Sequence, residues 1–337
     1  MRRRACWGAS GAALVALLGA CDGVQSALDP AGPQSARVET LWWFMIIVAT
    51  VIFILVVTAT LYASAHRHRA AISPADEARR ERRMHVGVAT ATGATALTLF
   101  VYLVVNFSTE RALASVGGGL PLTIEVTGTQ WWWRIRYIDT VSSNILTTAN
   151  EIHIPVGVPV KLELTSNDVI HSFWVPRLHG KKDLIPGRRA VIWLRADSAG
   201  VYRGQCAEFC GHQHALMGLT VIAEPRATFE AWWAQQLLPA AEPTTAEQRR
   251  GRDVFTSASC AMCHTIRGTD AGASVAPDLT HLASRGTIAA ATLPNTRGHL
   301  GGWILDPQSI KPGTKMPSSS LQPADLHALL SYLESLR

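Results

Sequence analysis

The sequence predicts a multidomain membrane protein in three parts: a hairpin of two transmembrane helices, an all-β domain and a small all-α domain. Its 337 residues are enough for two or three domains. Two uncharged apolar segments, 41–64 and 86–107, are long enough to span a bilayer, which takes ~20 helical residues. Short alternating segments follow after residue 117, and residues 246–337 return to helical periodicity around a Cys-x-x-Cys-His sequence.

The first residues are typical of an export signal. In residues 1–20, Arg2–Arg4 precede an apolar run from Ala12 to Leu18. The following Cys21 completes a lipoprotein-type cleavage site and would become a lipidated N-terminus; an ordinary signal peptide with an incidental cysteine is the alternative. Residues 21–40 are expected to form a tether. Without the three leader arginines the net charge falls from +6 to +3, which is no nucleic-acid signature.

The loop between the two apolar segments decides the orientation of the predicted hairpin, residues 41–110. Its arginines are Arg67, Arg69, Arg79, Arg80, Arg82 and Arg83. By the positive-inside rule this loop is cytoplasmic, so both termini lie outside. An exported N-terminus requires the same topology. Trp42 and Trp43 then fall at the outer interface, where indole rings prefer to lie.

Residues 117–238 have the pattern of a β domain. Residues 123–127 and 158–164 alternate between apolar and polar side chains, while 190–194 and 216–222 are short apolar runs. Several short strands separated by Pro and Gly predict a small sandwich or barrel.

One loop of this domain carries closely spaced donors for a soft metal. Cys210, His214 and Met217 are the ligand types of a mononuclear blue-copper site. Cys206 adds a second thiolate, and two thiolates can bridge two coppers that are capped by one histidine each. His171 is the candidate distant histidine, and the Glu208 carbonyl could reach one metal. The pattern predicts a dinuclear, thiolate-bridged copper centre for electron transfer.

Other interpretations of the loop stay open. Cys206 and Cys210 could form a disulfide, or two Cys and two His could hold tetrahedral zinc. His212 could replace His214 as a ligand. The remaining cysteines lie in the leader, the lipobox and the Cys-x-x-Cys-His motif, so none is left for a structural disulfide.

After a linker at 239–245, residues 246–337 form the all-α part. A capping box from Thr244 to Glu247 is expected to open its first helix. Cys260, Cys263 and His264 form a c-type haem attachment motif, although Cys-x-x-Cys alone also occurs in redox dithiols and zinc sites. Met316 is the natural sixth iron ligand, ahead of Met262 and His281. Four leucines mark a terminal amphipathic helix: Leu326, Leu329, Leu330 and Leu333.

The loop from Cys206 to Met217 resembles the CuA site of cytochrome c oxidase subunit II, and residues 246–337 resemble a class I cytochrome c. The resemblance implies a cupredoxin-like Greek-key domain with the following copper ligands: His171, Cys206, the Glu208 carbonyl, Cys210, His214 and Met217. It also implies magnesium at the subunit I interface through the Glu208 side chain. The first aromatic residue after Gln130, Trp131, would be the surface residue where electrons enter.

The resemblance implies an electron-transfer subunit of a respiratory oxidase in a bacterial inner membrane. Electrons would pass from a donor through haem c and CuA to subunit I, which reduces oxygen and pumps protons. Expected partners are subunits I and III, and cytochrome c or a quinol–cytochrome c reductase as donor. Relatives often have a glutamate at the start of the second helix, where this chain has Met84-His85-Val86-Gly87, so a role in proton uptake is in doubt. A CuA-type nitric oxide reductase and a membrane-tethered copper carrier are the alternatives.

Overall fold

The computed structural model describes residues 23–66, 73–114 and 122–337. The predicted signal peptide, the lipobox Cys21, and Arg67 and Arg69 of the basic loop lie outside these ranges. The described chain divides into two compact units, residues 36–116 and the rest.

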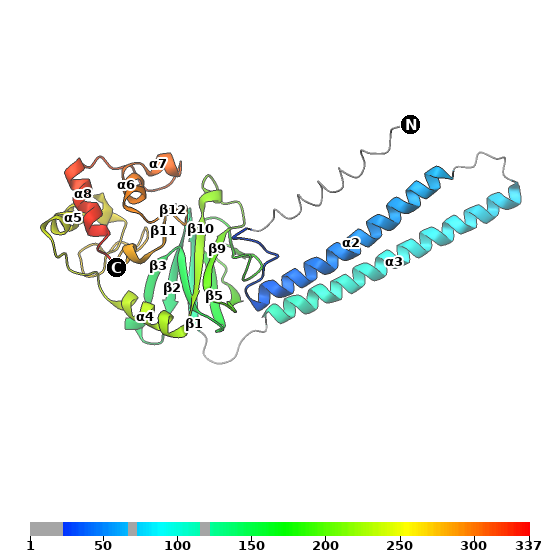
Figure 1. Cartoon of the computed structure of the whole chain (residues 1–337), viewed down its shortest axis with the longest axis horizontal. Helices are drawn as coiled ribbons and strands as arrows, with labels where there is room; N and C mark the ends of the chain where they lie inside the picture. The colour runs from blue at the N-terminus through cyan, green and yellow to red at the C-terminus, as the bar shows by residue number, and fades with distance from the viewer. Residues whose placement is uncertain (1–22, 67–72, 115–121) are drawn as a thin grey trace, which may run out of the picture. The chain divides into compact units, whose positions relative to one another are not determined.

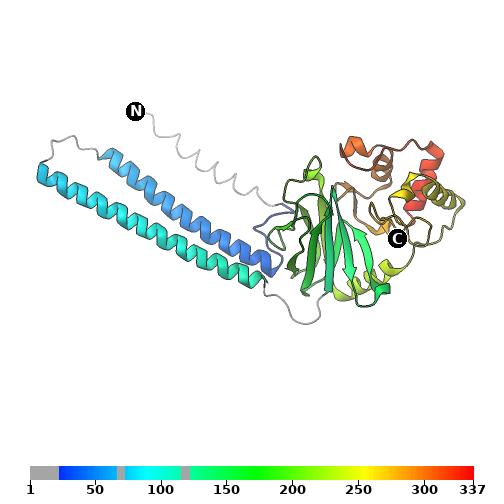
Figure 2. The same cartoon turned by 180° about the vertical axis from the view of Figure 1, so that it is seen from behind.

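The first unit is a hairpin of two long helices, α2 (Pro33–Ala65) and α3 (Pro74–Ala114), which run side by side in Figures 1 and 2. Both are long and apolar enough to cross a membrane. They extend beyond the predicted spans because polar turns continue each helix. Ser73 caps the start of α3 by accepting a hydrogen bond from the Asp76 amide at 3.2 Å.

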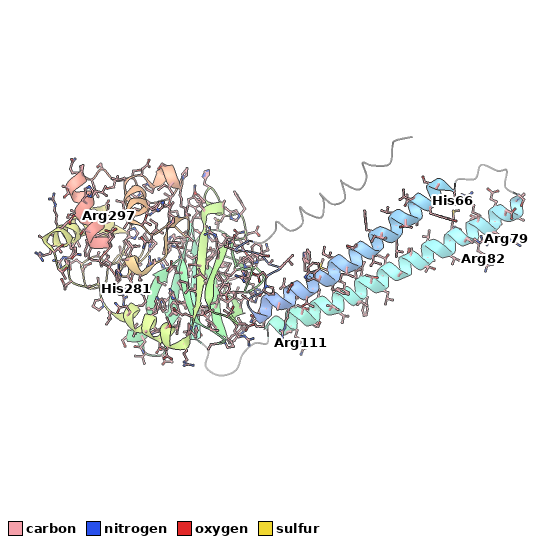
Figure 3. All side chains as sticks on the ribbon, viewed as in Figure 1. His66, Arg79, Arg82, Arg111, His281 and Arg297 are labelled. Atoms are coloured by element: carbon pink, nitrogen blue, oxygen red, sulfur yellow. The ribbon has the colours of Figure 1, made fainter. Side chains whose placement is uncertain are left out.

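The charged residues of the hairpin gather at its ends. Figure 3 shows Arg79 and Arg82 near the end of the hairpin that also carries His66, and Arg111 at the opposite end. The apolar stretch between them carries no charge, as a bilayer core requires.

The segment before α2 packs on the β domain instead of forming a free tether. Ala31 is buried, and its amide donates to the Arg177 carbonyl at 2.7 Å. The Ala31 carbonyl accepts from the Asp197 amide at 2.8 Å. A Cβ at Gly32 would overlap the Arg195 carbonyl, so only glycine allows this close approach.

The β domain is a sandwich of two five-stranded sheets with the orders β3-β2-β1-β5-β8 and β4-β10-β9-β6-β7. Its strands are β1 (Leu122–Thr129), β2 (Trp132–Ile138), β3 (Leu146–Ala149), β4 (Glu151–Pro155), β5 (Val160–Ser166), β6 (His171–Trp174), β7 (Lys182–Leu184), β8 (Ala190–Leu194), β9 (Gly200–Cys206) and β10 (Gly218–Glu224). The chain crosses between the sheets at Asn150, whose φ of 63° bends it between β3 and β4. The alternation predicts a small sandwich or barrel and the resemblance implies a cupredoxin-like domain, and the observed sandwich agrees with both.

The core of the sandwich is filled from both sheets. Trp133, Tyr137 and Phe173 are fully buried there, and Trp133 meets Phe173 edge to face at 6.0 Å between ring centroids. Helix α4 (Arg226–Leu237), which the sequence analysis did not predict, packs Trp232 and Trp233 onto Tyr137.

The C-terminal domain is helical, as predicted. It contains α5 (Ala246–Ser257), α6 (Arg297–Leu305), α7 (Pro307–Ile310), α8 (Pro323–Leu333) and the two-stranded ribbon β11 (Thr287–Ile288) with β12 (Leu293–Pro294). The prediction of the first cap was wrong by one residue. Thr245 is the N-cap and Gln248 completes the box, because the helix begins at Ala246. The predicted linker is also anchored, since the Ala240 amide donates to the Arg267 carbonyl at 2.9 Å.

Candidate copper and haem sites

Strand pairing brings the predicted copper donors to one end of the sandwich. His171 begins β6 and Cys206 ends β9, and these two strands pair antiparallel with Phe173 opposite Cys206. The loop after Cys206 returns to β10 through a turn at His214–Leu216. The turn places Met217 directly before β10, so the remote histidine and the loop meet at the same edge.

The donor atoms converge on two sulfurs that are 3.8 Å apart. Cys206 Sγ lies 3.8 Å from His171 Nδ1 and 3.2 Å from the Glu208 carbonyl oxygen. Cys210 Sγ lies 3.6 Å from His214 Nδ1 and 3.9 Å from Met217 Sδ. Each sulfur therefore has its own imidazole and one weaker donor, and all six predicted donors come together.

The chemistry of this donor set fits two coppers. Two thiols, two imidazoles, a thioether and a carbonyl exceed the four ligands of tetrahedral zinc, and the thioether is a copper ligand. Cys206 and Cys210 are free thiols, so no disulfide occupies them. His212, the alternative to His214, is exposed and faces Gly313.

The pKa values of the two thiols are shifted in opposite directions. The hydrogen bond between the sulfurs lowers the pKa of Cys206 to about 3, although burial opposes this shift. The same bond, together with burial, raises the pKa of Cys210. A thiolate is thus present at neutral pH, which a metal can bind without first displacing both protons.

His171 is held by its surroundings on two sides. Its Nε2 lies 2.8 Å from Asp168 Oδ1, which leaves Nδ1 facing the sulfur of Cys206. Burial lowers the pKa of His171, but the hydrogen bonds to Cys206 and Asp168 outweigh it, so the pKa is raised. A Cβ at Gly128 would approach the ring to 2.8 Å, so the ring packs where only glycine fits.

Trp131 lies against the copper loop. Its Nε1 donates to the Cys210 carbonyl at 3.0 Å, and Gln130 Nε2 donates to the same oxygen at 2.7 Å. Trp131 is half-buried, whereas Trp133 belongs to the core and Trp132 lies under the Arg134 guanidinium. One of the three tryptophans therefore connects the loop with the domain surface.

The haem motif follows α5 in a short 3-10 turn, Ser259–Met262. His264 Nδ1 lies 2.7 Å from the Pro277 carbonyl, and since a carbonyl only accepts, Nδ1 carries the proton and Nε2 is free to bind iron. Burial lowers the pKa of His264, which keeps the imidazole neutral. Cys260 and Met316 both border the hydrophobic cluster of this domain. These residues fit a covalent haem.

The loop that carries Met316 is fixed from within. Gln308 Nε2 donates to the carbonyls of Thr314 and Met316 at 2.8 and 3.0 Å. The alternative ligands are placed elsewhere: Met262 is 69% exposed, and buried His281 binds the carbonyls of Leu238 and Arg337.

The sequence analysis missed the residues that orient the ligands. Asp168 lies three residues before His171, and this short spacing next to a candidate metal histidine was the available signal. Gly128 and the Pro277 carbonyl come from distant segments, so no local pattern pointed to them.

Comparisons with known proteins match this arrangement. The family model "Cytochrome C oxidase subunit II, periplasmic domain" matches residues 122–224, and that of cytochrome c matches residues 248–337. Cytochrome c oxidase subunit 2 of Alkalihalophilus pseudofirmus is 35% identical over 321 residues, which cover 93% of this chain and 91% of that protein. The same subunit of Bacillus sp. (strain PS3) is 33% identical over 229 residues, 64% of this chain and 62% of that protein.

Among solved structures, the periplasmic domain of subunit II of cytochrome oxidase of Bradyrhizobium japonicum is 30% identical, with a TM-score of 0.33. The match covers 35% of this chain and 95% of that one. The relatives are subunits of an oxidoreductase, and the match to the Alkalihalophilus subunit extends over nearly the full length of both chains. The chain therefore belongs to the cytochrome c oxidase subunit II family and carries a cytochrome c domain at its C-terminal end.

Proposed function

We propose that this chain is the electron-entry subunit of a respiratory oxidase, taking electrons from a donor and delivering them through haem c and CuA to subunit I. There oxygen is reduced to water and protons are pumped. When bound, the haem and the dinuclear copper would each accept and release single electrons. Four further donors (two imidazoles, a thioether and a carbonyl oxygen) converge on two sulfurs 3.8 Å apart, in a chain that also carries a haem motif, and this arrangement supports the proposal.

On the copper side the chain would hold the metals rigidly. The residues that would hold them are the Cys206 and Cys210 thiolates, His171, His214, Met217 and the Glu208 carbonyl. Asp168 fixes the ring of His171, and burial of both sulfurs keeps water from the metals. A rigid, dry site changes little in structure when its charge changes.

On the haem side, Cys260 and Cys263 would bind the porphyrin covalently, with His264 and Met316 as iron ligands. The Pro277 carbonyl orients His264. A His/Met pair raises the reduction potential of a haem. Trp131, held on the Cys210 carbonyl, is the proposed entry point on the copper side.

The remaining expectations concern assembly. We place the chain in a bacterial inner membrane with two spans and both termini outside, a lipid anchor at Cys21, and subunits I and III as neighbours. The donor would be cytochrome c or a quinol–cytochrome c reductase. The Glu208 carboxylate is partly exposed and lies 3.3 Å from Lys181 Nζ. We propose that it binds magnesium at the interface with subunit I.

Metal analysis of the purified membrane complex tests the proposal. We expect two coppers per covalently bound haem c in this chain, with the haem retained after denaturation. One copper, or zinc, in a fully loaded sample would contradict the dinuclear site. Assays with oxygen and nitric oxide on the same preparation separate an oxidase from a nitric oxide reductase, and copper retained under a mild chelator excludes a copper carrier.

A further inference from the structure

The cytochrome c domain contacts the copper domain through two charged side chains that are buried where the domains meet. Lys311 follows α7 of the cytochrome c domain and is 2% exposed. Glu151 opens β4 of the copper domain and is 4% exposed. Burying a charge is unfavourable unless hydrogen bonds compensate it, so the partners of both side chains decide what they do.

Lys311 reaches from the cytochrome c domain to the copper loop. Its Nζ donates to the Leu216 carbonyl at 2.8 Å, the Ala289 carbonyl at 3.2 Å and the Trp131 carbonyl at 3.3 Å. An ammonium has three donors, and here each has an acceptor. Burial lowers the pKa of Lys311 to about 8, so the amine is still largely protonated at pH 7. Two of the three acceptors belong to the copper domain, directly before Met217 and at Trp131.

A strained turn of the cytochrome c domain lies beside Lys311. Ala289, Ala290 and Ala291 all have left-handed φ values, 53°, 59° and 56°, which residues other than glycine rarely adopt. The turn joins β11 to β12, which Figure 1 shows beside β10. Its carbonyls face partners across the interface: Ala290 accepts from the Gly218 amide at 3.1 Å and Ala291 from Arg203 at 3.0 Å. Such strain persists only where surrounding contacts maintain it.

Glu151 reaches in the opposite direction. Its Oε1 accepts from the Gly286 amide at 2.9 Å and the Thr287 amide at 3.2 Å, both in the cytochrome c domain. Arg285 supplies a positive charge nearby. Each domain therefore inserts one buried charge into the backbone of the other. The ion pair of Lys315 with Asp168, 3.9 Å long, lies at the edge of this contact, and exposed pairs of this kind contribute little.

We propose that Lys311 and Glu151 form a two-point lock that holds the cytochrome c domain on the Trp131 face of the copper domain, and that this docked arrangement is the state in which the two domains exchange electrons. The second half rests on the proposed function. Lys311 and Glu151 are positioning residues, because neither belongs to the predicted ligands. Directional hydrogen bonds at these two buried points fix the orientation of the domain, and the hydrogen bonds from Gly218 and Arg203 to the strained turn lie between the same two surfaces.

Amide hydrogen exchange of the full-length chain in its purified complex tests the lock. The Gly286 and Thr287 amides report on the Glu151 contact, and the Gly218 amide reports on the strained turn. Lys311→Ala should speed exchange at Gly286 and Thr287 at least about tenfold, although Lys311 contacts neither residue. Glu151→Ala should likewise speed exchange at Gly218. The double variant should exchange these amides little faster than either single variant, because losing one of the two contacts is expected to release the domain.

Lys182→Ala, an exposed lysine of the copper domain, is the matched control and should leave these amides unchanged. Copper and haem spectra should match wild type in all variants, while electron transfer between the domains, followed by rapid mixing, slows in both lock variants. If Lys311→Ala changes exchange only around residues 216 and 289, the lock does not exist. If the wild-type amides are protected as expected but the chain does not hold two coppers, the proposed function is overturned and the lock is not. A lock that opens without slowing electron transfer would overturn only the claim about the docked state.

Discussion

His171 and Asp168 form a hydrogen bond of 2.8 Å that turns the other ring nitrogen of the histidine toward the sulfur of Cys206. Asp168 also accepts from the Gln130 amide at 2.7 Å, so the carboxylate connects the histidine with the residue next to Trp131. Burial raises the pKa of Asp168, but the hydrogen bonds from Gln130, His171 and Val169 outweigh it, so the pKa is lowered. The carboxylate stays charged at neutral pH and orients the ring.

Asp168→Asn should weaken copper binding about 10–100-fold, the usual cost of losing a partner that orients a metal ligand. Competition with a copper chelator measures this on the purified complex. Asp197→Asn, which removes an exposed carboxylate paired with Arg195, is the control and should bind copper as wild type does. Equal affinities in the two variants would show that Asp168 does not orient His171.

Met217→Leu should keep both coppers and shift their reduction potential. The thioether lies 3.9 Å from Cys210 Sγ and is a weak ligand that tunes a copper site more than it holds the metal. Metal analysis and a redox titration of the copper spectrum measure the two quantities. Loss of all copper would show that Met217 is essential for binding.

Met316→Ala should leave the haem covalently attached and lower its potential, because the sixth ligand is lost. Electron entry from the physiological donor should slow sharply, while an artificial donor that reduces copper directly still supports oxygen uptake. Rapid-mixing spectroscopy separates the two steps. If turnover with the physiological donor is unchanged in Met316→Ala, the haem does not lie on the main path of electron entry.

Gly251→Ala should destabilise the cytochrome c domain by about 1–3 kcal/mol, because the added Cβ would overlap the Ala328 carbonyl of α8 and force α5 away. Gly302→Ala is the matched control. It lies in α6, and no atom beyond the neighbouring backbone of that helix comes within 4 Å of its added Cβ, so the substitution should be neutral or stabilise the helix. Calorimetry of both variants measures the difference, and equal melting temperatures would contradict the close packing.

The topology prediction is tested with protease added to intact spheroplasts. The C-terminal domains should be removed, while the basic loop at residues 66–83 is spared because it lies inside. Cleavage between Arg67 and Arg83 under these conditions would reverse the assignment.

The sequence by itself determined the three-part architecture, because hydrophobic length, strand alternation and the Cys-x-x-Cys-His motif are local patterns. It also identified the candidate copper donors from Cys206 to Met217, since these lie on one loop and are recognised from their spacing without any tertiary contact. Helix ends were less well predicted, as the Thr245 cap shows, because neighbouring threonines offer almost equivalent caps.

Only the tertiary structure decided what surrounds these donors. Asp168 reaches His171 because the loop before β6 bends back, and Gly128 meets the same ring from another strand. Lys311 lies four residues before Lys315 in the sequence, and nothing local distinguishes the buried lysine from the exposed one. Its burial against Leu216 and Trp131 depends on how the copper and cytochrome c domains pack, and the spacing of side chains along the chain does not reveal that packing.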